Sequence, residues 1–239
     1  MLRNMKDLLN YAVSATDGPI GHVTDLYFDG AGWVIRYVVV DTGSWLSSRR
    51  VLIAPVAMGY PHGAGDQPGW MEKVFSVAIT KEQLKNSPDI DTDKPVTRQH
   101  ELCYLGYYGY PRYWAEFQAT SDAPEDACLH SCKAVLRYRV EAVDGDIGQV
   151  QGFLVDEDTW ALRYIVVETN NWWLDHPVLI APQWIQSADW SASTVHLNLS
   201  RKQVKEAPPY DPAKPVDRPE EQDIYRHYGR AGYWVEAHR

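Results

Sequence analysis

The chain has 239 residues, a length that suits two domains of roughly 100–150 residues each. Apolar residues make up 45% of it and charged residues 23%, so each half has enough apolar side chains to bury a core. The formal net charge is -9 at pH 7, which argues against direct binding of nucleic acid, because such binding usually needs a basic face.

In chain order, the first half alternates turn signals with strand signals. Asp17-Gly18 and Asp29-Gly30 are dipeptides typical of tight turns. The stretch 33–41, WVIRYVVVD, is β-branched and aromatic, which is the composition of a well-buried strand. Further strands are expected at 21–28, 51–55 and 74–79.

A short helix is expected after the last of these strands. Thr80 can accept a hydrogen bond from the backbone at the helix start, and Gln83 can reach back to form a capping box. Pro88 then stops the helix. The same three signals recur in the second half at Ser200, Gln203 and Pro208.

The second half repeats the first. Residues 2–55 align without a gap with residues 129–182, and both segments end in VLIAP. The alignment then resumes from residues 80–98 to residues 200–218, and it extends to the segments YYGYPRYW and HYGRAGYW. A period this long indicates a duplicated domain rather than a solenoid.

The pattern predicts a mainly β fold made of two tandem small antiparallel barrels. Each barrel is expected to carry one short helix and an aromatic C-terminal tail rich in Tyr and Trp. The predicted domains are repeat 1 at residues 1–115, an acidic linker at 116–127 and repeat 2 at 128–239.

The motif that carries both copies is D-G-x-x-I-G-x-V, an acidic turn, an apolar strand and V-L-I-x-P. With this motif, both halves resemble the PRC-barrel family, which includes the cytoplasmic barrel of the photosynthetic reaction centre H subunit and the C-terminal barrel of a ribosome maturation factor. The resemblance implies a non-enzymatic barrel that binds other macromolecules. It supplies no catalytic residue. The chain differs from both relatives because it has two barrels and neither a membrane helix nor the factor's separate N-terminal domain.

Motifs for catalysis and metal binding are incomplete. The stretch CLHSC at 128–132 offers two cysteines and a histidine, but a tetrahedral zinc site needs a fourth ligand, and the first repeat has Arg3 and Met5 at the positions of His130 and Cys132. The three cysteines do not form a disulfide framework. We expect no catalytic, cofactor-binding or metal-ligating residues, and therefore no enzyme.

Four residues in the loop after the central strand are the candidates for partner binding, because Trp and Arg dominate the energetics of protein interfaces. The alternative is that these rings cap the barrel mouth or pack between the two repeats. The aromatic tails leave the same two alternatives open. The candidates are Trp45 and Arg49 in the first repeat and Trp172 and Trp173 in the second.

The leading prediction is a protein-interaction or assembly module in the cytoplasm, with a protein as its partner and any membrane contact made only through that partner. The N-terminus has no apolar stretch typical of a secretion signal, and no window approaches the ~18 apolar residues of a membrane helix. One alternative is a factor associated with ribosome or RNA maturation. Another is an accessory of a photosynthetic reaction centre or a similar membrane complex. Whether the chain forms a homo-oligomer is left open.

Overall fold

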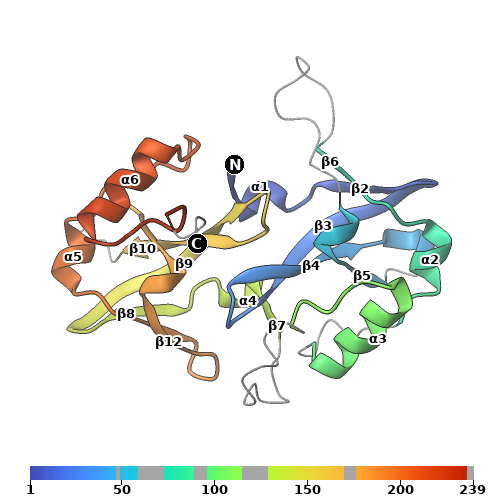
Figure 1. Cartoon of the computed structure of the whole chain (residues 1–239), viewed down its shortest axis with the longest axis horizontal. Coiled ribbons are helices and arrows are strands. Elements are labelled where there is room, and N and C mark those ends of the chain that lie inside the picture. Colours follow the sequence, from blue (N-terminus) through green and yellow to red (C-terminus); the bar gives the residue numbers. More distant parts are fainter. Residues whose placement is uncertain (47–48, 59–72, 89–95, 115–128, 170–175, 236–239) are drawn as a thin grey trace. The chain divides into compact units, whose positions relative to one another are not determined.

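The computed structural model describes residues 1–46, 49–58, 73–88, 96–114, 129–169 and 176–235. These residues form a mainly β structure that divides into two compact units (Figure 1). One unit is Asp7–Lys133, and the other joins Met1–Lys6 to Ala134–Arg239. The predicted acidic linker at 116–127 lies outside the described residues.

The unit Asp7–Lys133 is built on one curled sheet with the order β5-β4-β3-β2-β6, and β7 pairs with β3 beside this path. Its strands are β2 (Ala12–Ala15), β3 (Gly18–Asp29), β4 (Val34–Asp41), β5 (Arg50–Ile53), β6 (Val74–Ser76) and β7 (Leu129–Ser131). Its helices are α2 (Lys81–Lys85) and α3 (Arg98–Tyr108), with 3-10 turns at η1 (Gly43–Leu46) and η2 (Pro55–Ala57).

The other unit has a sheet of the order β11-β10-β9-β8-β13-β12, and β1 pairs with β9 beside this path. Its strands are β1 (Leu2–Asn4), β8 (Arg139–Ala142), β9 (Gly145–Asp156), β10 (Leu162–Thr169), β11 (Val178–Ile180), β12 (Ile185–Asp189) and β13 (Thr194–Leu197). Its helices are α5 (Arg201–Lys205) and α6 (Arg218–His227), with a 3-10 turn at η4 (Pro182–Trp184). Two further short helices, α1 (Met5–Leu8) and α4 (Cys132–Val135), each contain a boundary between the units.

Each sheet is mixed, whereas the sequence predicted antiparallel barrels. β2 pairs with β6 in parallel, and β8 pairs with β13 in parallel, while the other pairings are antiparallel. A parallel pair needs a long crossover, and in each unit the central strands and their connections separate its two members along the chain. Register shifts between β3 and β4, and between β9 and β10, mark bulges that increase the twist of the sheet.

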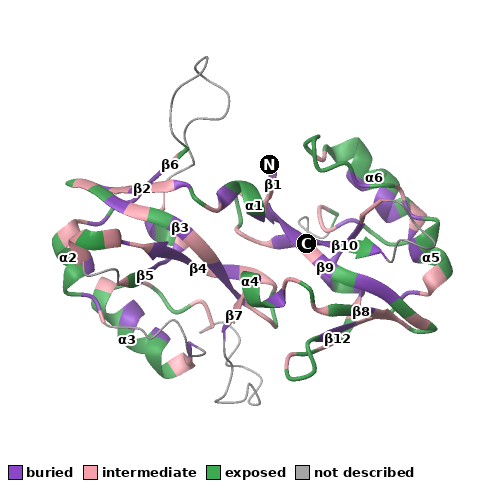
Figure 2. Cartoon of the chain, turned by 180° about the vertical axis from the view of Figure 1, so that it is seen from behind, coloured by how far each residue is buried: buried purple, intermediate pink, exposed green. Residues whose placement is uncertain are grey.

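The central strands are buried on both faces, as the run of β-branched residues predicted. In β4, Val38, Val39 and Val40 are all buried, so side chains that point to opposite faces meet apolar neighbours on each side. The strand β9 is buried over most of its length, and β3 is most buried towards its end, at residues 26–28 (Figure 2). One apolar cluster of the unit Asp7–Lys133 joins the sheet to α3 and β7, and its members are Tyr27, Tyr37, Val39, Leu52, Ala54, Val96, Tyr104, Leu105 and Leu129.

The two short helices predicted by capping boxes are present. The hydroxyl of Thr80 accepts a hydrogen bond from the backbone N–H of Gln83, whose side chain accepts one from the backbone of Thr80, and Ser200 and Gln203 make the same pair of contacts. The prediction of one helix in each repeat is wrong. A second, longer helix, α3 or α6, covers the start of each segment that we predicted as an aromatic tail.

Candidate functional site

Trp45 is half-buried and lies in η1, the 3-10 turn that begins the loop after β4. Its indole N–H donates a hydrogen bond to the backbone carbonyl of Ile20, and the ammonium group of Lys81 lies 4.6 Å from its ring centroid. The polar edge of the ring is therefore held by the unit itself, while part of the ring stays exposed to solvent. A tryptophan with a fixed orientation and an accessible face can contact a partner at little cost in conformational entropy.

Arg49 lies in the same region and holds the end of a helix. Its guanidinium donates hydrogen bonds to the carbonyl oxygens of Lys85, Ser87 and Pro88 at 3.4, 2.9 and 2.8 Å. These carbonyls lie at and just after the C-terminus of α2, where backbone acceptors lack helical partners. Arg49 therefore has a structural contact that the sequence did not reveal.

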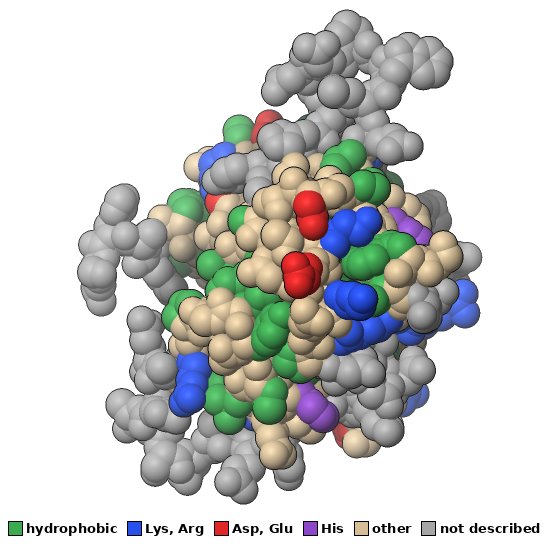
Figure 3. Space-filling view, turned by 90° about the vertical axis from the view of Figure 1, so that its right-hand side faces the viewer, with side chains coloured by type: hydrophobic (Ala, Val, Ile, Leu, Met, Phe, Trp, Pro, Cys, Tyr) green, Lys and Arg blue, Asp and Glu red, His purple; other side chains and the backbone are tan. Residues whose placement is uncertain are grey.

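Trp45, Arg49, Lys81 and Lys85 together make a basic and aromatic area, which we call the Trp45 surface. Lys81 contacts the ring of Trp45, Arg49 contacts the backbone carbonyl of Lys85, and both lysines belong to α2. Figure 3 shows Lys and Arg side chains beside hydrophobic ones on the face of the molecule that carries α2 and α3. The other two candidates, Trp172 and Trp173, lie outside the described residues.

A buried polar cluster that the sequence did not predict fixes the segment that follows α3 in the unit Asp7–Lys133. The carboxylate of Glu101 on α3 is fully buried and accepts a hydrogen bond of 2.7 Å from the hydroxyl of Tyr113. The guanidinium of Arg98 lies 3.1 Å from the same carboxylate and 4.1 Å from the ring centroid of Trp114. Arg36 on β4 stacks 3.7 Å above the ring of Tyr113.

The charges in this cluster are compensated locally. Burial raises the pKa of Glu101, and the hydrogen bond from Tyr113 and the charge of Arg98 oppose that increase. Burial, with the nearby Glu101 carboxylate, also raises the pKa of Tyr37 far above its ordinary value. Arg36 forms an ion pair of 3.2 Å with Asp29 at the end of β3. The cluster is thus neutralised within its unit.

The same cluster occurs in the unit that contains α6. Glu221 accepts hydrogen bonds from Tyr233 at 2.9 Å and from Tyr164 at 3.0 Å, and it pairs with Arg218 at 2.9 Å. Arg163 lies 4.0 Å from the ring centroid of Tyr233. These residues occupy the positions of Glu101, Tyr113, Tyr37, Arg98 and Arg36 in the first repeat.

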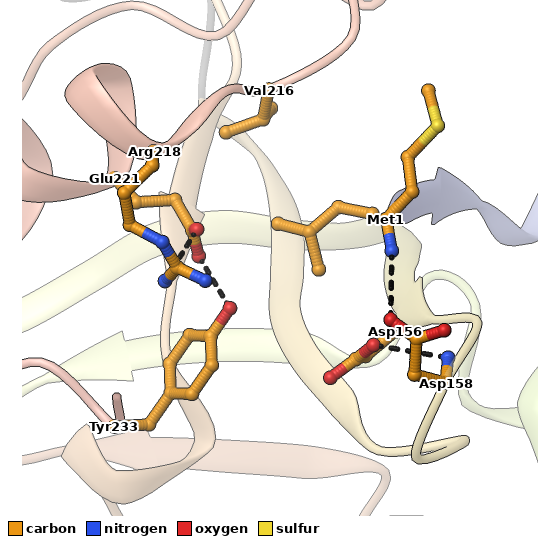
Figure 4. A pocket seen from close by; sticks show the side chains of 8 residues that line it. Met1, Asp156, Asp158, Val216, Arg218, Glu221 and Tyr233 are labelled. Atoms are coloured by element: carbon orange, nitrogen blue, oxygen red, sulfur yellow. Dashed lines mark hydrogen bonds and ion pairs between the residues drawn. The ribbon is translucent and has the colours of Figure 1, made fainter. Parts of the chain in front are cut away.

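A cavity of about 230 Å³ opens beside this second cluster (Figure 4). The side chain of Asp156 forms part of its lining. Burial alone would raise the pKa of Asp156, but hydrogen bonds from Thr159 and Arg163 lower it overall. The lining residues are Met1, Leu2, Asp156, Asp158, Val216, Arg218, Glu221 and Tyr233. The cavity is polar, and its charged groups are paired locally: Arg218 with Glu221 on one side of the view in Figure 4, and the amino group of Met1 with Asp158 on the other.

The CLHSC stretch has no metal-site geometry in the described part of the chain. Cys132 is fully buried, which raises the pKa of its thiol, and His130 packs against the ring of Phe28 at 5.7 Å. Cys128 lies outside the described residues. Across the described ranges, no group of three or more His, Cys, Asp or Glu side chains could hold a metal ion. Nor does any helix within these ranges have the length and apolarity to cross a membrane.

Comparison with known families identifies one domain. Residues 4–59 match the PRC-barrel domain. The matched segment runs from the end of β1 through β5 to the 3-10 turn η2, so it contains Trp45, Arg49 and half of the first polar cluster. No curated protein matches the chain. The resemblance expected from the motif is therefore confirmed for this segment.

Sequence reasoning missed the two polar clusters, although a signal was present. The clusters consist of polar or aromatic residues that are identical in both repeats. Asp29, Arg36 and Tyr37 are identical to their counterparts in the aligned second repeat, but nothing in the strand pattern shows that they meet residues of α3. Identity at a polar position within a buried strand is the signal that could have indicated a cluster, because an ionised side chain there needs a partner.

Proposed function

We propose that the chain is a non-catalytic protein-interaction or assembly module of the PRC-barrel type, and that the Trp45 surface is its contact face. The observation that carries the proposal is the PRC-barrel domain at residues 4–59, which contains Trp45 and Arg49. The family resemblance implies binding of macromolecules rather than catalysis. In this proposal the second half is a further PRC-type barrel, and Trp172 and Trp173 form the corresponding face.

The internal contacts of the residues in the two polar clusters support this proposal. The carboxylates, guanidinium groups and tyrosine hydroxyls of the two clusters contact one another and hold the segments that follow α3 and α6. They are therefore engaged in internal contacts that a substrate would have to break. The Trp45 surface, in contrast, includes the exposed Lys85 and a half-exposed indole ring.

The chemistry of the Trp45 surface favours a partner with an acidic segment. Its cations come from Arg49, Lys81 and Lys85, although the chain as a whole carries a net charge of -9. A local basic area on an acidic protein attracts carboxylates at short range while the net charge repels extended polyanions. This distribution favours a protein partner over RNA, which is the partner class in the ribosome-maturation alternative.

The test is sedimentation of native lysate on gradients at low and high salt, with the chain detected by blotting. We expect the chain to migrate with a larger assembly at low salt and to be released at high salt, because exposed charge contacts are screened. The Trp45→Ala variant should migrate alone at both salt concentrations while its circular dichroism shows a folded protein. The matched control is Val143→Ala, because Val143 is 65% exposed and lies far from η1 in sequence.

The outcomes separate the alternatives. Migration of the unmodified chain by itself at both salt concentrations would refute the proposal, and so would a Trp45→Ala variant that stays in the assembly. Loss of the assembly after nuclease treatment would support the RNA alternative. Recovery in a pigmented membrane fraction would support the photosynthetic alternative.

A further inference from the structure

Two short strands, β1 and β7, each pair with a strand of the other sequence repeat. β1 belongs to the first repeat, but it pairs with β9 of the second repeat. β7 opens the second repeat, but it pairs with β3 of the first. The registers are equivalent, since Leu2 lies opposite Asp156 and Leu129 lies opposite Asp29. Each unit therefore receives one strand from the other repeat.

The edge of β9 has side chains that fit β1. The guanidinium of Arg3 forms an ion pair with Glu157, and both side chains are largely buried, with 17% and 14% exposed. Asn4 lies over Gly152: a β-carbon added to this glycine would lie 3.9 Å from the side-chain oxygen of Asn4. That oxygen accepts a hydrogen bond of 2.9 Å from the backbone N–H of Lys6.

The edge of β3 has different side chains that fit β7. The carboxylate of Asp25 accepts a hydrogen bond from the hydroxyl of Ser131 and another, of 3.1 Å, from the backbone N–H of Lys133. His130 of β7 packs on the ring of Phe28. At the equivalent position of β1, Arg3 lies opposite Val155, which has no ring.

The two edges differ at the positions that contact the exchanged strands. In the alignment of the repeats, Glu157 corresponds to Gly30, and Gly152 corresponds to Asp25. If β1 paired with β3 in the same register, Arg3 would lose its carboxylate partner and meet Gly30. If β7 paired with β9, Ser131 would lose Asp25 and meet Gly152. Loss of the carboxylate from a largely buried ion pair is strongly destabilising.

We propose that the edges of β9 and β3 are strand-binding sites, each selective for the strand of the other repeat. The β9 edge takes an extended segment with leucine, a basic residue and asparagine, and the β3 edge takes leucine, histidine and serine. The two repeats thus recognise each other by reciprocal strand exchange. This inference goes beyond the proposed function, because the ligand of each site is another part of the chain itself.

The direct test is a cysteine crosslink in the full chain. A protease site is inserted after Ser121, and Cys103 and Cys128 are changed to serine. One variant carries Asn4→Cys with Leu154→Cys, the pair that is opposed in the exchanged arrangement. The matched variant carries Asn4→Cys with Tyr27→Cys, the equivalent pair if β1 folded onto its own repeat. Each protein is folded, oxidised, cleaved and run on a denaturing gel with and without reductant.

We expect the first variant to give a crosslinked band at the mass of the intact chain, which reductant converts into two fragments. The matched variant should give two separate fragments under both conditions, because both of its introduced cysteines lie in the first fragment and the remaining Cys132 is fully buried. Two separate fragments from the first variant, or a disulfide between positions 4 and 27, would overturn the exchange.

Selectivity is tested by charge reversal in the cleaved chain with native residues at positions 4, 27 and 154. Arg3→Glu should weaken the association of the two fragments about tenfold or more in size-exclusion dilution, and Arg3→Glu with Glu157→Arg should restore it. Arg139→Glu is the control, because its ion pair with Glu141 does not involve β1. An Arg3→Glu protein that associates as well as this control, or a double variant without recovery, would overturn the proposed role of the ion pair.

Discussion

At two equivalent positions, a neighbouring strand leaves no space for a side chain. A β-carbon at Gly21 would lie 1.8 Å from the carbonyl oxygen of Asp41, and one at Gly148 would lie 2.0 Å from that of Glu168. These distances are far below van der Waals contact and involve backbone atoms, which cannot rotate away. The close approach of the strands at these bulged edges therefore requires glycine.

We predict that Gly21→Ala and Gly148→Ala each lower the free energy of unfolding by more than about 1 kcal/mol. Chemical denaturation followed by tryptophan fluorescence measures this change. The control is Gly106→Ala in α3, where a β-carbon meets nothing within 4 Å and alanine favours the helix. Equal stability of Gly21→Ala and Gly106→Ala would contradict the prediction.

The buried carboxylate of Glu101 links stability to pH. Because burial raises its pKa in the folded state, the folded chain binds this proton more tightly than the unfolded chain does. The contribution of Glu101 to the free energy of unfolding is therefore largest at acidic pH and falls as pH rises above the ordinary glutamate pKa of about 4.3.

We predict that Glu101→Gln removes the pH-dependent contribution of this residue to the free energy of unfolding. The stability of the variant relative to the parent should increase as pH rises through and above about 4.3, until the raised pKa is passed. Urea denaturation at a series of pH values gives the difference. Glu82→Gln, on the exposed side of α2, is the matched control. A difference for Glu101→Gln that stays constant with pH, or falls with it, would show that Glu101 does not titrate with a raised pKa.

At the scale of elements, one buried hydroxyl links α3 directly to the backbone at the end of β5. Tyr104 donates a hydrogen bond of 2.9 Å to the carbonyl oxygen of Leu52 and accepts one of 3.2 Å from the N–H of Ala54. Both partners lie at the end of β5, where the strand leaves the sheet. The helix then ends at Gly109, whose left-handed backbone, with φ of 69°, is favourable for glycine.

We predict that Tyr104→Phe lowers the free energy of unfolding by about 1–3 kcal/mol, because it leaves a buried N–H without its partner. Thermal denaturation measures the loss. Tyr107→Phe on the same helix removes a hydroxyl that donates to the carbonyl of Gln83 near solvent, so its effect should be about 0.5 kcal/mol or less. Similar losses for the two variants would refute the role of the Tyr104 hydroxyl.

The helices show what the sequence could predict at this scale. The capping boxes at Thr80 and Ser200 were predicted correctly, because a capping box is a local contact between residues three positions apart. The capping box that starts α6 at Asp217 was missed, because the density of aromatic residues favoured an extended tail. In the structure, these aromatic rings pack on the sheet through tertiary contacts that no local pattern reveals.

At the scale of the whole molecule, two units carry the same polar cluster with different bonding. Arg163 donates two hydrogen bonds to Asp156, from Nε at 3.1 Å and from Nη2 at 2.8 Å, and a third to Thr159. Arg36 makes one hydrogen bond, of 3.2 Å, to Asp29, among the contacts described. The planar guanidinium suits this bonding at Arg163, and a lysine cannot reproduce it.

We therefore predict that Arg163→Lys destabilises the chain more than Arg36→Lys does, by about 1 kcal/mol. Both substitutions retain the positive charge, so the comparison isolates the geometry of the hydrogen bonds. Parallel denaturation curves of the two variants provide the measurement. An Arg36→Lys protein that is the less stable of the two would contradict this ranking.

The duplication was visible in the sequence, but the exchange of strands was not. Leu2–Asn4 and Leu129–Ser131 fit the same register on either long strand, so the hydrophobic pattern alone cannot show which copy each strand joins. The contacts that distinguish the copies, Arg3 with Glu157 and Ser131 with Asp25, join residues more than one hundred positions apart. Only the folded structure brings them together.

The exchange also fixes the order of events on the ribosome. Residues 2–4 are translated well before their partner strand, Gly145–Asp156, which lies more than 140 positions further along the chain. At synthesis rates of about 5–20 residues per second, the interval is about 7–30 seconds. During that time β3 also waits for Leu129–Ser131. The edge of β3 therefore stays unfilled until the opening of the second repeat has been translated, and β1 stays unpaired until β9 follows. An unpaired strand edge is a template for wrong strand pairing during this interval.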